Sequence, residues 1–248
     1  MYNFFVDASA RVGDCFEIGG KDHNHICNVL RMGPGATFLV SCGGVSNLCR
    51  LEQIEEDRVV ARILEEDCRS TELSVEFYLF QGLPKADKME LIIQKSVELG
   101  AAGIIPVEMH RCIVKLEDKK KKSRVERWQA IAESAAKQSK RNLVPQIFDV
   151  MPYRQALAMA ADMDLFWVPY ENERGMAATK EALEALKPGM KVGIFIGPEG
   201  GFEDKEIALA KEAGAAVISL GSRILRTETA AVAAVTMGML HVEMNLAE

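Results

Sequence analysis

The chain has 248 residues, of which 48% are hydrophobic and 27% charged, and its formal net charge is −6. This is the balance of an ordinary soluble globular protein with enough apolar residues for a sizeable core. No apolar run approaches the roughly 20 residues that a bilayer-spanning helix needs, which excludes that class of protein. The N-terminus lacks the pattern of a secretory signal, so we expect a cytoplasmic location, with the six cysteines as reduced thiols.

The first 70 residues are predicted to be rich in β-strands. Short runs with β-branched or alternating apolar residues occur at 36–42, 48–54 and 58–66, and glycines punctuate them. Several short strands with turns indicate a small barrel. One short helix is predicted at 22–31, where Ile26, Val29 and Leu30 follow helical spacing.

After about residue 72 the pattern changes to alternating strands and helices. This alternation predicts an α/β domain with a mostly parallel sheet and helices on both faces. The polar stretch at 70–74 marks the boundary, so we predict two domains, 1–72 and 73–248. The expected strands lie at 73–83, 103–109, 164–170, 191–197 and 215–221, and the expected helices at 87–100, 123–140, 176–187, 203–214 and 227–245. Asp87 is predicted to cap the first of these helices, and Gly100 to follow its end.

The basic residues are concentrated in one segment. Residues 85–141 hold 14 Lys plus Arg against 8 Asp plus Glu, so the rest of the chain is strongly acidic. A basic segment on an acidic protein is a candidate surface for a polyanion such as RNA. The lysine-rich run 115–127 taken alone is better explained as a solvated loop.

The sequence GPEGG at 197–201 follows a predicted strand and precedes a predicted helix. Phosphate-binding loops usually place a cation near backbone N–H groups, whereas this turn carries Glu199 and neither Lys nor Arg. ATP, GTP and NAD are therefore poor candidates. S-adenosylmethionine fits better, because it has no phosphate and carries a sulfonium cation, and because glycines allow close approach of the main chain. A tight turn with a solvated Glu199 explains the residues equally well.

A second unusual loop, SLGSRILRTETA at 219–230, precedes the last helix. Arg226 stands just before that helix, which Thr227 or Thr229 is predicted to cap. Ala230, Ala234 and Gly238 form a ridge of small residues at four-residue spacing, which permits close packing against another backbone. An ordinary amphipathic helix would explain the alanines but not the arginine.

These two segments together resemble the SPOUT class of knotted RNA methyltransferases, and the RsmE family in particular. That family methylates N3 of a uridine in small-subunit (16S) ribosomal RNA. Three further segments resemble it in the same order along the chain: HICNVLRMGPGA (25–36), the strand–helix–strand at 81–107 and the basic helix at 126–147. The stretch FEDKE departs from the family, where we expect Ser or Thr as the cap; Glu203 or Asp204 can replace it.

The resemblance implies a deep trefoil knot formed by the C-terminal segment and a PUA-like N-terminal barrel that binds RNA. It also implies a homodimer with the knot helices at the interface, which would explain the small-residue ridge. S-adenosylmethionine is expected to bind between three loops that follow strands, at 167–171, 196–202 and 219–230. The cofactor-binding residues predicted in those loops are Val168, Pro169, Ile196, Gly197, Pro198, Gly200, Leu220, Gly221, Ile224, Leu225 and Ala230.

Methylation of uridine N3 requires removal of a weakly acidic proton and stabilisation of charge on O2 or O4. Arg226 is the predicted anion stabiliser, although a phosphate or helix-end contact explains it nearly as well. Glu199 and Glu228 are the carboxylates best placed to act as base. A capping role or a contact to a cofactor hydroxyl explains each of these two better.

The predicted RNA contacts lie in the basic segment 126–147 and on two other stretches of chain. They are Arg31, Lys85, Lys88, Lys137, Gln138 and Arg141. Lys137 and Arg141 share a face if the helix continues that far, and each of the six could instead be a solvated surface residue. We expect no metal, because His23, His25 and Cys27 lack the partners of a four-ligand site.

The function expected is methylation of a uridine N3 in small-subunit ribosomal RNA by S-adenosylmethionine, within an assembled subunit and by a homodimer without a membrane partner. A non-catalytic RNA-binding protein with a knot domain is the alternative. A different small-ligand α/β enzyme would leave the basic helix unexplained.

Overall fold

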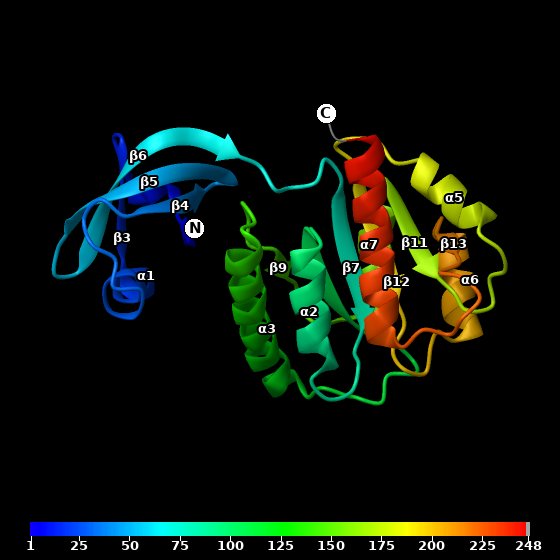
Figure 1. Ribbon diagram of the computed structural model, residues 1–248. Coiled ribbons are helices and arrows are strands. Elements are labelled where there is room, and N and C mark those ends of the chain that lie inside the picture. Colours follow the sequence, from blue (N-terminus) through cyan, green and yellow to red (C-terminus); the bar gives the residue numbers. More distant parts are fainter. Residues whose placement is uncertain (247–248) are drawn as a thin grey trace. The chain divides into compact units, whose positions relative to one another are not determined.

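The computed structural model of the chain describes residues 1–246, without the side chain of residue 118, and shows two compact units (Figure 1). The first comprises Met1–Glu72 and Ala136–Val144, and the second comprises Leu73–Ala135 and Pro145–Glu248. The first unit thus contains residues 136–144 as well as 1–72, whereas the predicted domains were 1–72 and 73–248. The last two residues of that predicted domain lie outside the described part of the chain.

The first unit is built on a six-stranded sheet with the order β1-β4-β5-β6-β3-β2. Its strands are β1 (Asn3–Val6), β2 (Arg11–Val12), β3 (Cys15–Gly19), β4 (Thr37–Cys42), β5 (Val45–Ile54) and β6 (Arg58–Arg69). Only the β1–β4 pair is parallel. Within the described residues β1 and β2 do not pair with each other, so the sheet is a half-barrel. The closed barrel predicted from the run of short strands is not observed.

One face of this sheet carries an aromatic core. Phe4, Phe16 and Phe38 are buried, and the rings of Phe4 and Phe38 meet edge to face with centroids 5.3 Å apart. The short helix predicted at 22–31 is present, but it is divided into α1 (Gly20–Asn24) and a π-helical turn, η2 (His25–Val29). A π-turn inserts an extra residue into the helical repeat. Ile26 is therefore buried while Val29, which was predicted on the same face, is 63% exposed.

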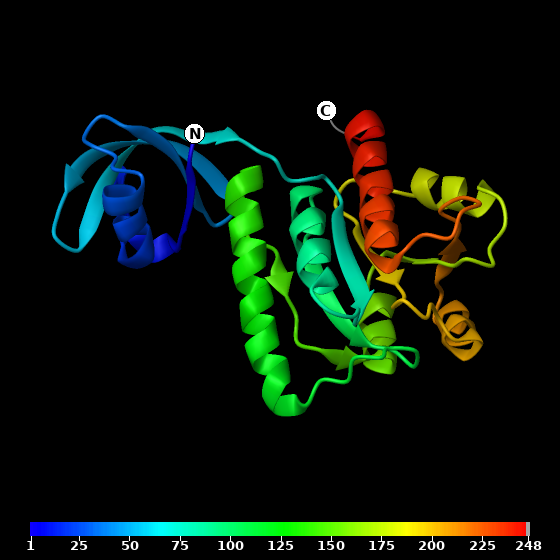
Figure 2. The ribbon, with the colours of Figure 1, turned by 60° about the horizontal axis from the view of Figure 1, so that its bottom comes forward.

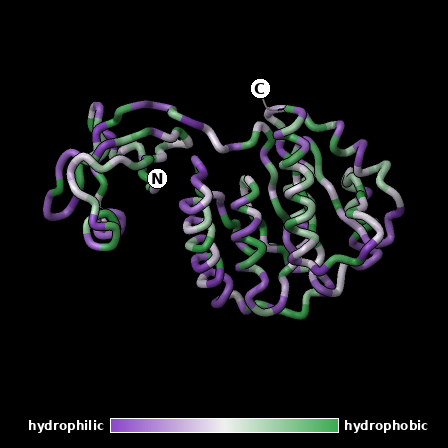
Figure 3. Tube along the Cα trace, in the orientation of Figure 1, coloured by the Kyte–Doolittle hydropathy of each residue, from purple (hydrophilic) through white to green (hydrophobic). Residues whose placement is uncertain are grey.

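The second unit contains a seven-stranded sheet in which every recorded pair is parallel, as the alternation of elements predicts. The order is β10-β8-β7-β12-β11-β13, and β9 pairs with β8. The strands are β7 (Glu76–Gly82), β8 (Gly103–Glu108), β9 (Gln146–Ile147), β10 (Met151–Pro152), β11 (Leu165–Pro169), β12 (Lys191–Ile196) and β13 (Ala216–Ile218). Buried apolar side chains fill the central strands, which Figure 3 shows as largely hydrophobic.

Helices cover both faces of this sheet. They are α2 (Lys88–Glu98), α3 (Asp118–Ser139), α4 (Tyr153–Ala161), α5 (Ala177–Glu184), α6 (Asp204–Glu212) and α7 (Thr227–Asn245). Figures 1 and 2 show α2 and α7 on one face and α4 and α6 on the other. Gly100 and Gly214 follow the ends of α2 and α6 with φ of +95° and +97°, so both predicted helix ends are confirmed.

Three predicted details of the helices differ in their outcome. Asp87 stands at the N-cap of α2, but its side chain makes no capping hydrogen bond. The small-residue ridge of α7 packs on the chain's own sheet: a Cβ at Gly238 would lie 2.7 Å from Cζ of Phe77, and Ala234 is fully buried. Ala234 and Gly238 therefore serve close packing inside the unit. At α6 the substitute cap is confirmed, since Glu206 accepts the N–H of the N-cap residue Glu203 at 2.8 Å.

Candidate functional site

A cavity of about 390 Å³ opens at the carboxyl ends of β11, β12 and β13, in the second unit. This edge is where ligands bind in open parallel sheets, because the loops after the strands converge there. Three loops and the start of α7 form its wall. The lining residues are Lys88, Pro169, Tyr170, Glu171, Ile196, Gly197, Pro198, Glu199, Gly201, Phe202, Leu220, Gly221, Arg223, Ile224, Leu225, Arg226, Thr227 and Ala230.

Glycines set the shape of the loop that follows β12. A Cβ at Gly197 would lie 3.1 Å from the carbonyl carbon of Gly201, so the loop can fold back on itself only without side chains there. Gly201 has a φ of +67°, which glycine adopts without strain. On the neighbouring strand β7, a Cβ at Gly82 would meet Pro198 Cδ at 2.7 Å. Backbone therefore packs directly against backbone at the cavity edge.

A buried chain of hydrogen bonds joins three segments at this point. The Gln81 side-chain amide at the end of β7 donates to the hydroxyl of Thr227 at 2.9 Å and to the Gly82 carbonyl at 2.8 Å. The Thr227 hydroxyl in turn donates to the Gly197 carbonyl at 2.7 Å. Gln81 is fully buried and Thr227 is 5% exposed. These bonds fix the first turn of α7 against the glycine loop.

Thr227 does not cap α7 as the sequence predicted. The N-cap is Arg226, and Thr227 is the first residue of the helix, with its hydroxyl turned toward the Gly197 loop. Thr229, the other predicted cap, is the third residue of the helix and is exposed. The threonine next to Arg226 therefore links the loop to the helix rather than closing the helix end.

Charged side chains form a compact network beside the glycine loop. Lys88 Nζ lies 3.0 Å from Oε1 of Glu199 and 3.4 Å from Oε2 of Glu228. The Lys85 backbone N–H also donates to Glu199 Oε1, at 3.0 Å. Burial pushes the pKa of Glu199 upward, but these hydrogen bonds outweigh it and hold the pKa below its ordinary value. The hydrogen bond with Glu199 raises the pKa of Lys88.

This network bears on the predicted bases. A carboxylate with a lowered pKa, already paired with an ammonium group, is a weak proton acceptor. Glu199 lines the cavity, whereas Glu228 is absent from the cavity wall and reaches the network through Lys88. Lys88 was predicted to contact RNA, but its ammonium group is held by two carboxylates at the cavity.

The cavity wall carries charges of both signs. Arg226, predicted from its position before α7, lines the wall together with Arg223, which was not predicted. Within the described residues neither guanidinium has an ion-pair partner. Glu171 lies on the opposite loop, with its carboxylate close to Gly201. The wall therefore offers cations and carboxylates together rather than a cluster of cations for phosphates.

The predicted cofactor residues line this cavity except for two. Val168 is fully buried within β11, and its side chain packs in the core. Gly200 lies behind the wall, where its carbonyl accepts a hydrogen bond from the Arg111 guanidinium at 3.0 Å. The lining residues that the sequence did not reveal are Lys88, Tyr170, Glu171, Gly201, Phe202, Arg223 and Thr227. All of these except Lys88 lie in or next to the predicted loops, so their position beside predicted cofactor residues could have identified them.

The predicted RNA contacts Lys137 and Arg141 do not share a face of α3. The helix ends at Ser139, and Lys140 takes a φ of +61°, so Arg141 lies beyond the helix. Arg141 is 3% exposed and donates from Nε to both carboxylate oxygens of Glu72, at 2.9 and 3.0 Å. This buried pair, all within the first unit, leaves the guanidinium unable to reach a phosphate.

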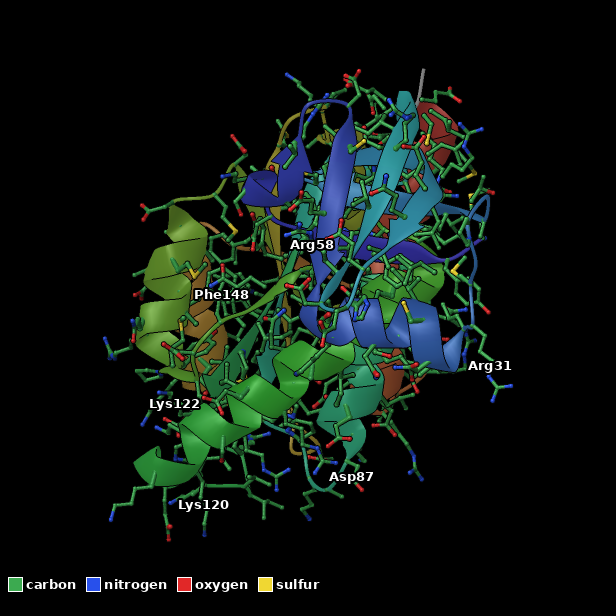
Figure 4. The ribbon with its side chains drawn as sticks, turned by 90° about the vertical axis from the view of Figure 1, so that its left-hand side faces the viewer. Arg31, Arg58, Asp87, Lys120, Lys122 and Phe148 are labelled. Atoms are coloured by element: carbon green, nitrogen blue, oxygen red, sulfur yellow. The ribbon has the colours of Figure 1, made fainter. Side chains whose placement is uncertain are left out.

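The other predicted RNA contacts differ in their exposure and in their ion pairing. Lys137 Nζ pairs with Asp22 at 3.0 Å within the first unit. Gln138 and Lys85 are exposed. Arg31 is also exposed, has a φ of +52°, and points into solvent (Figure 4). Arg31, Lys85 and Gln138 thus have the exposure that an RNA contact needs.

The described residues offer neither a metal site nor a membrane-spanning helix. No group of three or more His, Cys, Asp and Glu side chains there could hold a metal ion. His23, one of the residues considered for a metal, lies with Nε2 3.2 Å from the Glu55 carbonyl oxygen. None of the described helices is long and apolar enough to cross a bilayer.

Comparison with known proteins adds to this geometry. Residues 71–239 match the family model of the RNA methyltransferase domain. The chain is 40% identical to ribosomal RNA small subunit methyltransferase E of Bacillus subtilis, over 93% of both chains. The crystal structure of the corresponding protein of Neisseria gonorrhoeae, bound to S-adenosylmethionine, is 34% identical with a TM-score of 0.80 over 95% of both chains. A putative methyltransferase of Legionella pneumophila in complex with the same cofactor is 29% identical, with a TM-score of 0.82 over 96% of this chain and 97% of that one.

Proposed function

This chain belongs to the family of ribosomal RNA small subunit methyltransferases E, and from that membership we propose its reaction. It transfers a methyl group from S-adenosylmethionine to N3 of a uridine in 16S ribosomal RNA. The observation that carries the proposal is the cavity at the carboxyl ends of β11, β12 and β13, built from glycine loops and lined by both carboxylates and cations. The assembled small subunit in the cytoplasm is the proposed substrate.

The cavity residues fit S-adenosylmethionine, which two structurally similar relatives bind. The volume of the cavity, about 390 Å³, lies in the range of small-molecule sites. Backbone groups of the Gly197 loop and of Leu220 and Gly221 are suited to the edge of an adenine. The carboxylates of Glu171 and Glu199 favour a cationic ligand and disfavour a diphosphate. When bound, this cofactor supplies a methyl group on a positively charged sulfur.

The chain's own cations would assist the reaction of the uridine. The N3 proton passes to a water molecule, so that the N3 lone pair can form the new N–C bond while the old S–C bond breaks. Negative charge then develops on O2 and O4 of the base, and Arg226 and Lys88 both line the cavity where it can be stabilised. Two cations near the base lower the pKa of N3, which reduces the need for a strong protein base. We propose that Glu199 orients Lys88 and that Glu228 supports it.

From the same family membership we propose that the C-terminal segment forms a knot and that the protein is a homodimer. The segment from β13 to α7 passes beside the Gly197 loop, which is consistent with threading of residues 219–245. Apolar residues predominate in α7 and are not confined to one face, and Figure 3 shows this helix more hydrophobic than α3. Leu240 and Met244 are 43% and 72% exposed on it, which a second copy would cover. We expect L240E to convert a dimer to a monomer in analytical ultracentrifugation; a wild-type monomer at micromolar concentration would contradict the dimer.

The first unit and the exposed residues Arg31, Lys85 and Gln138 are the proposed RNA contacts. A non-catalytic RNA-binding protein is the second candidate, since RNA contacts alone would not require methyl transfer. The two are separated by incubating the protein with unmethylated small subunits and labelled S-adenosylmethionine. One methyl group per subunit is expected, and RNA binding without transfer would favour the second candidate. Thermal stabilisation by S-adenosylmethionine, but not by NAD or ATP, tests the cavity independently.

A further inference from the structure

A second, smaller cavity lies in the second unit beside the segment that leads into α2. Its volume is about 110 Å³, several times the roughly 30 Å³ of a water molecule in the liquid, which suits a single flat ring. The lining residues are Leu83, Pro84, Ala86, Asp87, Met89, Val114, Leu116, Arg124 and Trp128. Residues 83–89 therefore lie between this cavity and the first one, which Lys88 lines.

The floor of this cavity is apolar and its rim is polar. Leu83 and Met89 are each 2% exposed and Trp128 is 4% exposed, so they form the floor. Asp87 and Arg124 are exposed and form part of the rim. A nucleobase has apolar faces and polar edges, and unstacked bases bind proteins against aromatic and apolar side chains in this way.

Arg124 lies at the rim, and further cations lie along the adjoining residues 115–122. Residues 115–127 hold seven Lys plus Arg against three Asp plus Glu. Lys120, Lys121 and Arg127 are paired with Glu117, Glu108 and Glu90. Arg124 and the exposed lysines at 115, 119 and 122 have no ion-pair partner in the described part of the chain. Figure 4 shows Lys120 and Lys122 extending outward from the first turns of α3. An apolar cavity with an unpaired arginine at its rim and further unpaired cations on the adjoining segment fits a base with its flanking phosphates.

The segment between the two cavities is held in a strained form. Ala86 has a φ of +52°, which is uncommon for a residue with a side chain. The next residue back, Lys85, donates its N–H to Glu199 in the wall of the first cavity. The hydrogen bond of Lys85 thus links the segment that lines the second cavity to the wall of the first.

We propose that this second cavity binds an unstacked nucleobase close in sequence to the target uridine, with its phosphates on the cations at the start of α3. This inference rests on the proposed function, because it assumes that the ligand of the second unit is RNA. The base in the second cavity sets which uridine enters the first one, so the cavity is a specificity subsite. An acidic protein segment is the other occupant that these charges would admit.

The test uses a pocket-filling variant, L116W, which leaves every charge in place. The matched control is I113W, because Ile113 is 65% exposed on the same loop and does not line the cavity. The probes are nine-nucleotide RNAs with a central uridine, each with one abasic nucleotide at a different flanking position, bound to the dimer saturated with S-adenosylmethionine. Affinity for each RNA is measured by fluorescence anisotropy, and cofactor affinity by calorimetry.

One flanking position is expected at which loss of the base weakens binding roughly tenfold in the wild type and in I113W. In L116W the intact RNA should already bind about tenfold more weakly, with no further loss from the abasic nucleotide. Equal losses in L116W and wild type at every position would overturn the proposal, as would unchanged RNA affinity in L116W, which would leave an acidic protein segment as the occupant. Failure of the proposed function is distinguishable, because it would appear as no uridine methylation by the wild type or no binding of the cofactor.

Discussion

Substitution of Thr227 by valine tests whether the buried hydrogen bonds at the start of α7 position the cofactor loop. Valine keeps the shape of the side chain and removes the hydroxyl, which donates to the Gly197 carbonyl at 2.7 Å and accepts from Gln81 at 2.9 Å. Two net hydrogen bonds of about 0.5–1.5 kcal/mol each are lost, so the free energy of unfolding should fall by about 1–3 kcal/mol. Gln81 retains its bond to the Gly82 carbonyl, which limits the cost.

The effect on cofactor binding separates positioning from general stability. Without the hydrogen bond from Thr227, the loop that contains Gly197 can move. A loss of about 1.4 kcal/mol of binding free energy would weaken binding of S-adenosylmethionine tenfold. Isothermal titration calorimetry measures this dissociation constant, and urea unfolding measures stability. T227S keeps the hydroxyl and should bind the cofactor like the wild type. If T227V bound the cofactor within twofold of the wild type, or if T227S were equally weakened, the positioning role would be refuted.

Three further predictions follow from single residues. The lowered pKa of Glu199 and the raised pKa of Lys88 predict that their pair stabilises the fold between about pH 5 and 10. The stability difference between wild type and E199Q, measured by urea unfolding against pH, should shrink as the pH falls below 4.5 or rises above 10.5; a difference that grew in acid would have the wrong sign. G82A should abolish cofactor binding and lower stability by about 1–3 kcal/mol, because its Cβ would lie 2.7 Å from a proline ring of the cofactor loop. G33A, with open space around it, should change stability by less than about 0.5 kcal/mol, and equal losses in the two variants would contradict the contact. R141A should lower stability by about 1.5–3 kcal/mol by removing the charge-assisted hydrogen bonds to the partly buried Glu72, which keeps the backbone N–H groups of Asn142 and Leu143 as donors, without changing the salt dependence of RNA binding; a slope reduced by about one would restore its role as a phosphate contact.

The fold of the second unit could be predicted because its strands are buried on both faces and its helices carry regular apolar periods. The run LSVEFYLFQGL predicted β7, and the pattern from 87 to 100 predicted α2 with its closing glycine. Helix α4 (Tyr153–Ala161) was missed, because its alanine-rich sequence lacks a capping residue and a clear break from the preceding loop. Strand β1 (Asn3–Val6) was missed for a different reason: it is short, and only its parallel pairing with β4 defines it.

The candidate site could be predicted where its residues are contiguous in sequence. Gly197, Pro198 and Gly221 follow strands directly, so their convergence is a consequence of the parallel sheet. Residues brought in by tertiary structure could not be placed. Lys88 begins a helix far away in sequence, and only the structure shows it between Glu199 and Glu228.

The buried and paired state of other charged residues also escaped the sequence. Arg141 resembles any surface arginine in a basic helix, and its burial depends on the end of α3 and on Glu72. The π-turn at His25–Val29 shifted the helical phase without a warning in the residues themselves. Both errors arise because exposure is decided by partners that lie elsewhere in the chain.

The most direct test is the position of the methyl group on the RNA. Purified protein is incubated with S-adenosylmethionine and small subunits from cells that lack this protein, and the ribosomal RNA is digested and analysed by mass spectrometry. One N3-methyluridine per 16S RNA is expected, and it should vanish when S-adenosylmethionine is omitted. A methyl group on another atom or nucleotide, or no transfer by protein that binds the cofactor, would contradict the proposed reaction.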